Sequence, residues 1–202
     1  MPRPTEALRV GGVILAAGAS RRMGKNKMLL QLEGESLIRR AVRRALAAEL
    51  SPVVVVIGHE SERIRAELQD LQVEFAINPD YTGPTSGSLH RGLNALGPNV
   101  GAAVVMLGDM VRVTQETLAM LVAAARGADG PPLVVSRYGD VTAPPLLFRR
   151  TLFPELLAWT GEGCGKTVVK THSHEAMYVD RPVALLADVD TPEDFEALRT
   201  SS

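Results

Sequence analysis

Short apolar runs alternate along this chain with longer amphipathic segments, and this alternation limits the possible folds more than any other feature of the sequence. The apolar runs predict strands at residues 13–15, 53–57, 73–77, 102–107 and 133–136. The first, second and fourth runs have little polar alternation, which is typical of strands covered on both faces. Strands that alternate with helices predict an α/β fold, a three-layer α/β/α sandwich around a mostly parallel central sheet.

Three amphipathic segments between these runs predict helices. In residues 36–50, an apolar stripe lies opposite Arg39, Arg40, Arg43 and Arg44, and we interpret these arginines as a solvated helix face rather than a nucleic-acid patch. Two further helical patterns begin at Ser61 and at Thr114, which are candidate N-caps.

Composition limits the classes of partner. The 202 residues carry a formal net charge of -1 and only 4% aromatic residues, which argues against a nucleic-acid-binding protein. The single cysteine, Cys164, excludes an intramolecular disulfide and fits a reducing compartment. The N-terminus lacks the apolar core of a signal peptide, and no apolar run approaches the ~18 residues of a membrane span. We therefore expect a soluble, cytoplasmic protein of one domain, residues 1–202, that binds neither nucleic acid nor a membrane.

The loop after the first predicted strand is a candidate phosphate site, because ligands of such sheets bind beyond the carboxyl ends of the strands. The stretch "VILAAGASRRMGKNK" places small residues, which let a ligand approach the main chain, before a cluster of positive charge. That cluster consists of Arg21, Arg22, Lys25 and Lys27, and a polyphosphate would relieve its self-repulsion. The loop lacks the dinucleotide fingerprint, and "GEGCGKT" at 161–167 is one residue short of a P-loop and follows a helical pattern, so we regard that match as accidental.

Carboxylates at two further places are candidate metal ligands. Asp109 follows the run 102–107 and Gly108, where it is either a ligand of a hard cation or a turn residue. Asp188 and Asp190 end the run "ALLADVD" and would share one face of an extended segment. Magnesium typically takes one or two protein carboxylates together with phosphate oxygens and water. Asp109 and Asp190 suit that role, Asp188 is a supporting or structural acid, and the residues after Asp190 (Thr191, Pro192 and Asp194) are explained as a helix cap.

Motifs spread over nearly the whole chain resemble those of nucleotidyltransferases with a GT-A-like, Rossmann-like fold. The resemblance is carried, in order, by "LAAGASRRMGKNK", "NPDYTGPTSGSLHRGL", "VVMLGDM", "LFRRTLFPELL" and "DVDTPEDFEAL". The chain is most similar to the molybdenum cofactor cytidylyltransferases and their MobA-like guanylyltransferase relatives. The guanylyl relatives usually have "LAGG" where this chain has "LAAG", which favours cytidine.

This resemblance implies a reaction and a role for each site residue. CMP would pass from CTP to the phosphate of molybdopterin, with release of pyrophosphate and with a molybdoenzyme as recipient of the product. The nucleotide would bind in a half of about residues 10–110, and the acceptor in a half of about residues 111–202. Arg22 would hold the leaving phosphates, Lys27 the α-phosphate, and Mg²⁺ would lie on Asp109 and Asp190. The base would lie against Leu15, Ala16, Ala17, Gly18, Gly83 and Ser88.

Three alternatives remain open from the sequence. The same chemistry would serve GTP in place of CTP, or a sugar phosphate or alcohol phosphate in place of molybdopterin. A nucleotide- or cofactor-binding regulator without turnover is the third, although such a protein has less need of both acids. Cys164 receives no role, and Lys166 is a candidate for an acceptor phosphate only by its charge and its glycine-rich surroundings.

Overall fold

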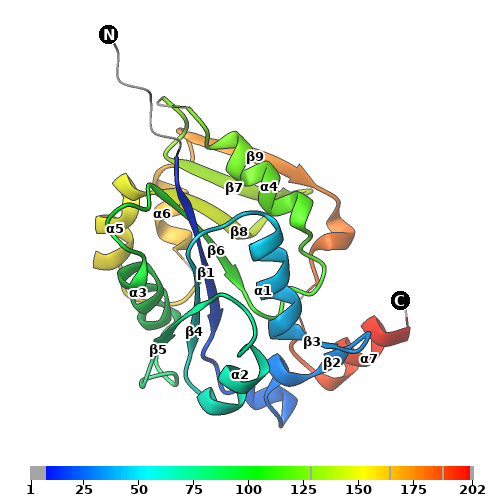
Figure 1. Cartoon of the computed structure of the whole chain (residues 1–202). Coiled ribbons are helices and arrows are strands. Elements are labelled where there is room, and N and C mark those ends of the chain that lie inside the picture. The colour runs from blue at the N-terminus through cyan, green and yellow to red at the C-terminus, as the bar shows by residue number, and fades with distance from the viewer. Residues whose placement is uncertain (1–7, 128, 164, 188, 201–202) are drawn as a thin grey trace.

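The computed structural model of the chain describes residues 8–127, 129–163, 165–187 and 189–200. Its centre is a seven-stranded sheet with the strand order β5-β4-β1-β6-β8-β7-β9 (Figure 1). Strand β8 is antiparallel to both of its neighbours, and the remaining pairs are parallel, so the sheet is mostly parallel as predicted. The bounds in chain order are β1 Val10–Ala16, β4 Val53–Ile57, β5 Glu74–Ile77, β6 Ala102–Leu107, β7 Leu133–Tyr138, β8 Val141–Arg149 and β9 Ala176–Arg181.

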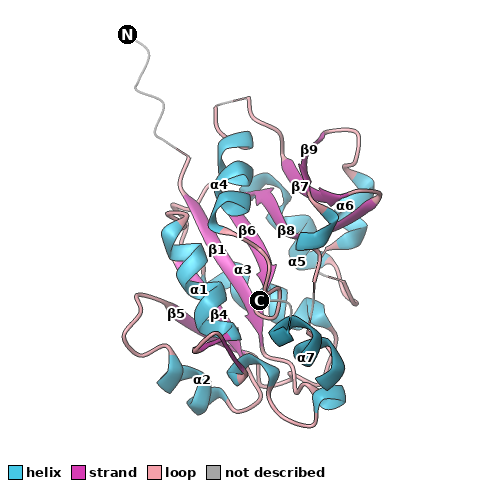
Figure 2. Cartoon of the chain, turned by 90° about the vertical axis from the view of Figure 1, so that its right-hand side faces the viewer, coloured by secondary structure: helices cyan, strands magenta, loops and turns pink. Residues whose placement is uncertain are grey.

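Helices cover both faces of this sheet and make the predicted α/β/α sandwich (Figures 1 and 2). One face carries α1 (Leu37–Ala47), α2 (Ser61–Glu67) and α4 (Gln115–Ala124). The other face carries α3 (Thr85–Ala95), α5 (Phe153–Ala158) and α6 (Lys166–Thr171). The last helix, α7 (Pro192–Thr200), packs beside the small hairpin of β2 (Gln31–Leu32) and β3 (Glu35–Ser36).

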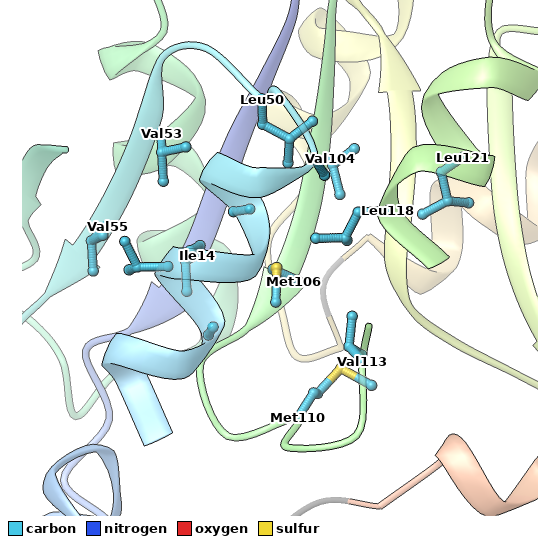
Figure 3. Packing of buried hydrophobic residues seen from close by; sticks show 14 of the residues in the cluster. Ile14, Leu50, Val53, Val55, Val104, Met106, Met110, Val113, Leu118 and Leu121 are labelled. Atoms are coloured by element: carbon cyan, nitrogen blue, oxygen red, sulfur yellow. The ribbon is translucent and has the colours of Figure 1, made fainter. Parts of the chain in front are cut away.

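Alternation along the strands divides the core into two layers. In β1, Ile14 packs toward α1, whereas Val13 and Leu15 pack toward α3. Figure 3 shows the first layer, in which Leu118 and Leu121 of α4 lie near side chains of β6. Side chains buried on both faces explain why the strand runs have so little polar alternation.

The predicted strands are all present, and β4 and β6 have the predicted bounds. The prediction of Thr114 as an N-cap is confirmed, because its side chain accepts a hydrogen bond from the backbone N–H of Thr117. The prediction for Ser61 is wrong: Ser61 is the first residue of α2, and the cap position is held by Glu60 in the left-handed region, with φ of 50°. Four strands were not predicted, namely β2, β3, β8 and β9.

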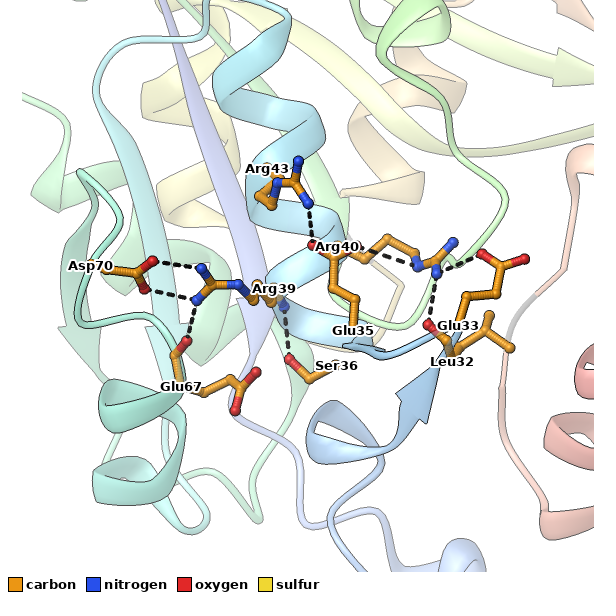
Figure 4. A network of polar contacts seen from close by, with 9 residues as sticks. All are labelled: Leu32, Glu33, Glu35, Ser36, Arg39, Arg40, Arg43, Glu67 and Asp70. Atoms are coloured by element: carbon orange, nitrogen blue, oxygen red, sulfur yellow. Dashed lines mark hydrogen bonds and ion pairs between the residues drawn. The ribbon is translucent and has the colours of Figure 1, made fainter.

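The arginines of α1 make more ion pairs and are less exposed than the predicted solvated face implies. Arg39 donates to both carboxylate oxygens of Asp70, and Arg40 pairs with Glu33 at 2.8 Å (Figure 4). The side chain of Arg40 is only 13% exposed, and that of Arg43 is 64% exposed. The expectation of a solvated face therefore holds at Arg43 but is wrong for Arg40, whose charge is held by acids of neighbouring elements.

Candidate active site

The carboxyl ends of β1 and β6 lie side by side in the sheet, so the loops that follow them share one edge. The loop after β1 is folded rather than open. The hydroxyl of Ser20 accepts a hydrogen bond of 3.1 Å from the backbone N–H of Lys27, and the Asn26 side chain caps the short 3-10 helix that begins at Lys27. Gly24, with φ of 68°, supplies the left-handed turn between them. This local structure fixes the start of the Lys27 side chain.

Lys27 joins the two predicted metal ligands. Its Nζ contacts a carboxylate oxygen of Asp109 and lies 2.9 Å from Oδ1 of Asp190. Arg22 approaches from the solvent side, with Nη2 at 2.7 Å from Oδ2 of Asp190. The side chains of Lys27 and Asp109 are 15% and 6% exposed, whereas that of Arg22 is 71% exposed. The structure thus brings together four residues that the sequence places up to 168 positions apart.

The charges of this cluster support one another. Burial by itself would lower the pKa of Lys27, but the carboxylates of Asp109 and Asp190 outweigh burial, and the pKa of Lys27 is raised. The hydrogen bond from Lys27 lowers the pKa of Asp190, and Arg22 adds to that effect. The site therefore presents an ammonium and a carboxylate, both charged, at neutral pH.

The same geometry tests whether a metal ion fits. The carboxylates of Asp109 and Asp190 face one cationic atom, so their oxygens converge on a single point. Two hard oxygen donors suit magnesium or manganese. Within the described ranges, no group of three or more His, Cys, Asp or Glu residues is placed to hold a metal, so a bound cation would complete its coordination with water or substrate oxygens.

A capping box fixes Asp190 at the start of α7. Oδ2 of Asp194 accepts hydrogen bonds from the backbone N–H groups of Asp190 (3.1 Å) and Thr191 (2.8 Å), and the Thr191 hydroxyl accepts one from Asp194. The predicted cap is confirmed. The run "ALLADVD" begins in a 3-10 helix, Val183–Leu185, and the described residues from Leu186 to Asp190 form no strand; a shared face for Asp188 and Asp190 stays a prediction. Buried Val189 anchors this segment instead, and Asp188 lies outside the described residues.

The turn that carries Asp109 is held by a half-buried arginine. Arg44 donates a hydrogen bond of 2.6 Å from Nη1 to the carbonyl of Val111, and the N–H of Val111 donates to the carbonyl of Asp109. Burial, with Arg40 as a second cause, lowers the pKa of Arg44. No carboxylate of the described residues lies within ion-pair distance of Arg44, so its interaction is directed at the turn.

A cavity of about 320 Å³ opens beside this cluster on the α3 side of the sheet. Its lining includes Leu15, Ala17, Gly18, Gly83 and Ser88 of the predicted base contacts, together with Lys27, Asp109 and Asp190.

Two of the predicted site residues are placed differently from expectation. Ala16 is 1% exposed and packs in the core on the opposite face, and Arg22 lies outside the cavity lining. Ser88 lines the cavity from inside α3, and its hydroxyl accepts a hydrogen bond of 2.9 Å from Asn78 Nδ2.

Sequence reasoning missed several residues of this cavity. Tyr81 and Thr85 line it from the loop after β5 and the start of α3. The hydroxyl of Thr85 contacts the carboxylate of Glu162, and the hydroxyl of Ser86 accepts a hydrogen bond of 3.1 Å from the N–H of Gly161. The loop before α6 is therefore tied to the start of α3, next to this cavity. The small residues of "GPTSG" after a strand were the available signal.

Comparisons with known proteins agree with this fold. The model of the MobA-like NTP transferase domain matches residues 12–176. The purine catabolism protein PucB of Bacillus subtilis is 29% identical over 93% of this chain and 95% of its own length. The bifunctional protein GlmU of Chromobacterium violaceum is 38% identical over 68% of this chain, which spans only 35% of that protein.

Among solved structures, the chain is similar to that of Rv0371c from Mycobacterium tuberculosis H37Rv. It superposes with a TM-score of 0.83 and 27% identity, covering 96% of this chain and all of its own. The same mycobacterial protein has also been solved in complex with manganese, with 26% identity and a TM-score of 0.78.

In the described part of this chain, no helix has the length and apolar character to cross a membrane.

Proposed function

Because this chain belongs to the MobA-like NTP transferase family, we propose that this nucleotidyltransferase transfers CMP from CTP to the phosphate of a molybdopterin acceptor. The observation that carries the proposal is the convergence of Lys27 on Asp109 and Asp190 at the mouth of the cavity. Positive charge and paired carboxylates at one point are what a triphosphate with its metal requires.

In the proposed reaction, a phosphate oxygen of the acceptor attacks the α-phosphorus of CTP, and pyrophosphate leaves. The protein contributes positioning and charge neutralisation rather than a covalent intermediate. Lys27 stabilises charge that develops on the α-phosphate, and exposed Arg22 binds the leaving phosphates. Both cations rest on Asp190 in the present structure, so this carboxylate holds them in place before the nucleotide arrives.

We assign a divalent metal, magnesium by preference, to Asp109 and Asp190. When bound, the ion would neutralise phosphate charge. The manganese complex of the mycobacterial relative supports a divalent cation in this group of structures. Arg44 positions the carboxylate of Asp109 through the turn after β6, and the capping box of α7 positions that of Asp190.

The base site favours cytosine over guanine. The methyl group of Ala17 lines the cavity at the position where the guanylyl relatives usually have glycine, and it takes up space that a purine would need. Gly18 next to it lets the base approach the main chain, because a Cβ at Gly18 would meet nothing within 4 Å. Use of GTP by the same machinery is the alternative that this contact disfavours.

The acceptor is assigned to the second half of the chain, residues 111–202, and the nucleotide to residues 10–110. A sugar phosphate or alcohol phosphate would use the same phosphate chemistry as molybdopterin. A regulator without turnover would have less need of both acids, Asp109 and Asp190, than a transferase does. A molybdoenzyme is the proposed recipient of the product.

A nucleotide panel tests the proposal. The melting temperature of the full chain is measured with CTP, GTP, ATP or UTP, each with Mg²⁺, since a ligand at ~100 times its Kd stabilises by about 2.7 kcal/mol. We expect the largest shift with CTP, followed by pyrophosphate release only when molybdopterin is added. Tight CTP binding without release on any phosphorylated acceptor would favour the regulator.

A further inference from the structure

A second cavity, of about 530 Å³, lies on the same side of the sheet as α6. Three segments line it: the β7–β8 turn with the first half of β8, the helix α6 with Gly163 before it and Ser173 after it, and β9 at Tyr178. All of its lining residues fall between positions 140 and 178, within the half assigned to the acceptor. No local sequence pattern links these three segments, so the cavity can be found only from the fold.

The two cavities are neighbours at two independent places. Val105 of β6 pairs with Leu146 of β8 in antiparallel register. Two residues further along each strand, Leu107 borders the first cavity and Pro144 borders the second. A molecule in the second cavity therefore lies one strand away from a nucleotide in the first.

The second junction is the loop before α6. Glu162 bonds to Thr85, which lines the first cavity, and the next residue, Gly163, lines the second. The main chain at Glu162 and Gly163 therefore joins a residue that contacts the lining of the first cavity to one that lines the second, and we call it the shared wall. Because its other side is tied to α3 through Ser86, this wall is held in place.

The lining of the second cavity combines two ammonium groups with apolar side chains and one carboxylate, that of Asp140. Lys166 and Lys170 are four residues apart, so they lie on one face of α6. Among the described residues, neither ammonium has a carboxylate within ion-pair distance. Leu146, Val169 and Tyr178 also line the cavity, with Val169 on the same helix as the two lysines. Two free ammonium groups beside these apolar side chains match a ligand with an anionic group on a flat or apolar body.

We propose that this cavity is the acceptor site, and that the acceptor carries a second anionic group, held by Lys166 and Lys170, away from the phosphate that reacts. That the ligand is the acceptor rests on the proposed function. The class of ligand rests on the lysine pair and the apolar residues that line the cavity. The acceptor's phosphate end reaches across the shared wall toward Asp109 and Asp190, while its body lies against Tyr178. A simple alcohol phosphate would leave both lysines without a partner.

The test uses anilinonaphthalene sulfonate, a fluorescent probe that has one anionic group on an aromatic body. It is titrated into the native full chain and into the K166Q/K170Q variant, each with and without saturating CTP and Mg²⁺. We expect one saturable site that the double variant weakens by about tenfold, since two charge contacts are lost. We also expect CTP to leave the probe in place, because the two cavities are separate.

The matched control is R91Q/R126Q, which removes two exposed positive charges that line neither cavity. It should bind the probe as the native chain does. Native-like affinity in K166Q/K170Q, or displacement of the probe by CTP, would overturn the proposal. Failure of the proposed function is a distinct outcome: in that case no nucleotide raises the melting temperature of the native chain. In the pyrophosphate assay, K166Q/K170Q should raise the KM for the acceptor and leave the KM for CTP unchanged; an equal rise in both also contradicts the assignment.

Discussion

The Nζ atom of Lys27 lies 2.9 Å from Oδ1 of Asp190, although the two residues are 163 positions apart in the chain. The same ammonium contacts the carboxylate of Asp109, which is almost fully buried. One side chain from the loop after β1 thus connects the turn after β6 to the start of α7. Because an isolated buried carboxylate is costly, this contact stabilises the fold as well as preparing the site.

Replacing Lys27 by alanine should reduce turnover by about 10²-fold, the effect typical of losing one preorganised electrostatic stabiliser. The measurement is the rate of pyrophosphate release at saturating CTP, Mg²⁺ and acceptor. Arg126→Ala is the control, because Arg126 is exposed, lies outside the cationic loop and lines neither cavity. Full activity in Lys27→Ala would remove Lys27 from the mechanism.

The same substitution should make stability depend on a divalent cation. Lys27→Ala leaves buried Asp109 without its partner, and losing one partner of a buried pair costs of the order of 3 kcal/mol. Mg²⁺ between Asp109 and Asp190 would then restore much of that loss. Melting temperatures are measured with EDTA and with Mg²⁺, and the rise on adding Mg²⁺ should be larger in Lys27→Ala than in the native chain. An equal rise in both proteins argues against a shared metal position.

Ala17→Gly should shift nucleotide preference toward GTP, because it removes the methyl group that lines the base cavity. We expect CTP to lose about threefold to tenfold in affinity relative to GTP, since one methyl-sized group in a pocket is worth roughly 1 kcal/mol. The readout is the ratio of the two Kd values from thermal shift. Ala16→Gly is the comparison, because Ala16 packs in the core away from the cavity and should leave the ratio unchanged.

The parts of the fold that the sequence predicts are those with local signals. The runs of β4 and β6 are unbroken apolar segments, and the cap of α7 needs only Thr191 and Asp194 three residues apart. Strand β8 carries two adjacent prolines, Pro144 and Pro145, which argue against a strand when read locally. Its pairing with β6 and β7 overrides that preference, and only the tertiary structure contains this information.

The candidate site also has residues that local sequence signals predict and residues that they do not. Small residues at Ala17 and Gly18 and the charge of Lys27 are visible in one loop, and a family resemblance links them to Asp109 and Asp190. The role of Arg44 is not visible, because its pattern is that of any amphipathic helix and its partner is a carbonyl 67 residues away. The second cavity is likewise a product of packing among distant segments.

Arg44→Met should lower kcat while leaving the Kd for CTP nearly unchanged. Methionine keeps the packing of the buried stem but loses the hydrogen bond of 2.6 Å to the carbonyl of Val111, so the turn that carries Asp109 gains freedom. A loss of roughly 10-fold fits a positioning residue whose effect is indirect. Arg43→Met is the matched control, since Arg43 is exposed and pairs only with Glu35 in the described part of the chain. Equal losses in both variants would contradict a specific role for Arg44.

Gly92→Ala should destabilise the contact between α3 and the sheet. A Cβ at Gly92 would meet Cγ1 of Val13 and lie 3.0 Å from Cγ2 of Val56, both of which are fully buried. Overpacking of this kind costs about 1–3 kcal/mol, or roughly 2–4 °C in melting temperature per kcal/mol for a chain of this size. Gly97→Ala is the control, because a Cβ there would meet nothing within 4 Å. A native melting temperature in Gly92→Ala would mean that the helix moves freely on the sheet.

His172, the C-cap residue of α6, should make stability depend on pH. Nε2 of His172 lies 2.7 Å from Glu155 and Nδ1 lies 3.2 Å from Glu175, and these hydrogen bonds raise the pKa of His172. Because the folded pKa lies above the unfolded value of about 6.5, the stabilisation is fully present below about pH 6.5 and is lost as pH rises through the folded pKa. The melting temperature of the native chain should therefore exceed that of His172→Gln at pH 5.5 by more than it does at pH 9. Glu155→Gln removes the main cause of the shift and should flatten this difference, whereas a difference that grows with pH would show that His172 acts as a neutral group.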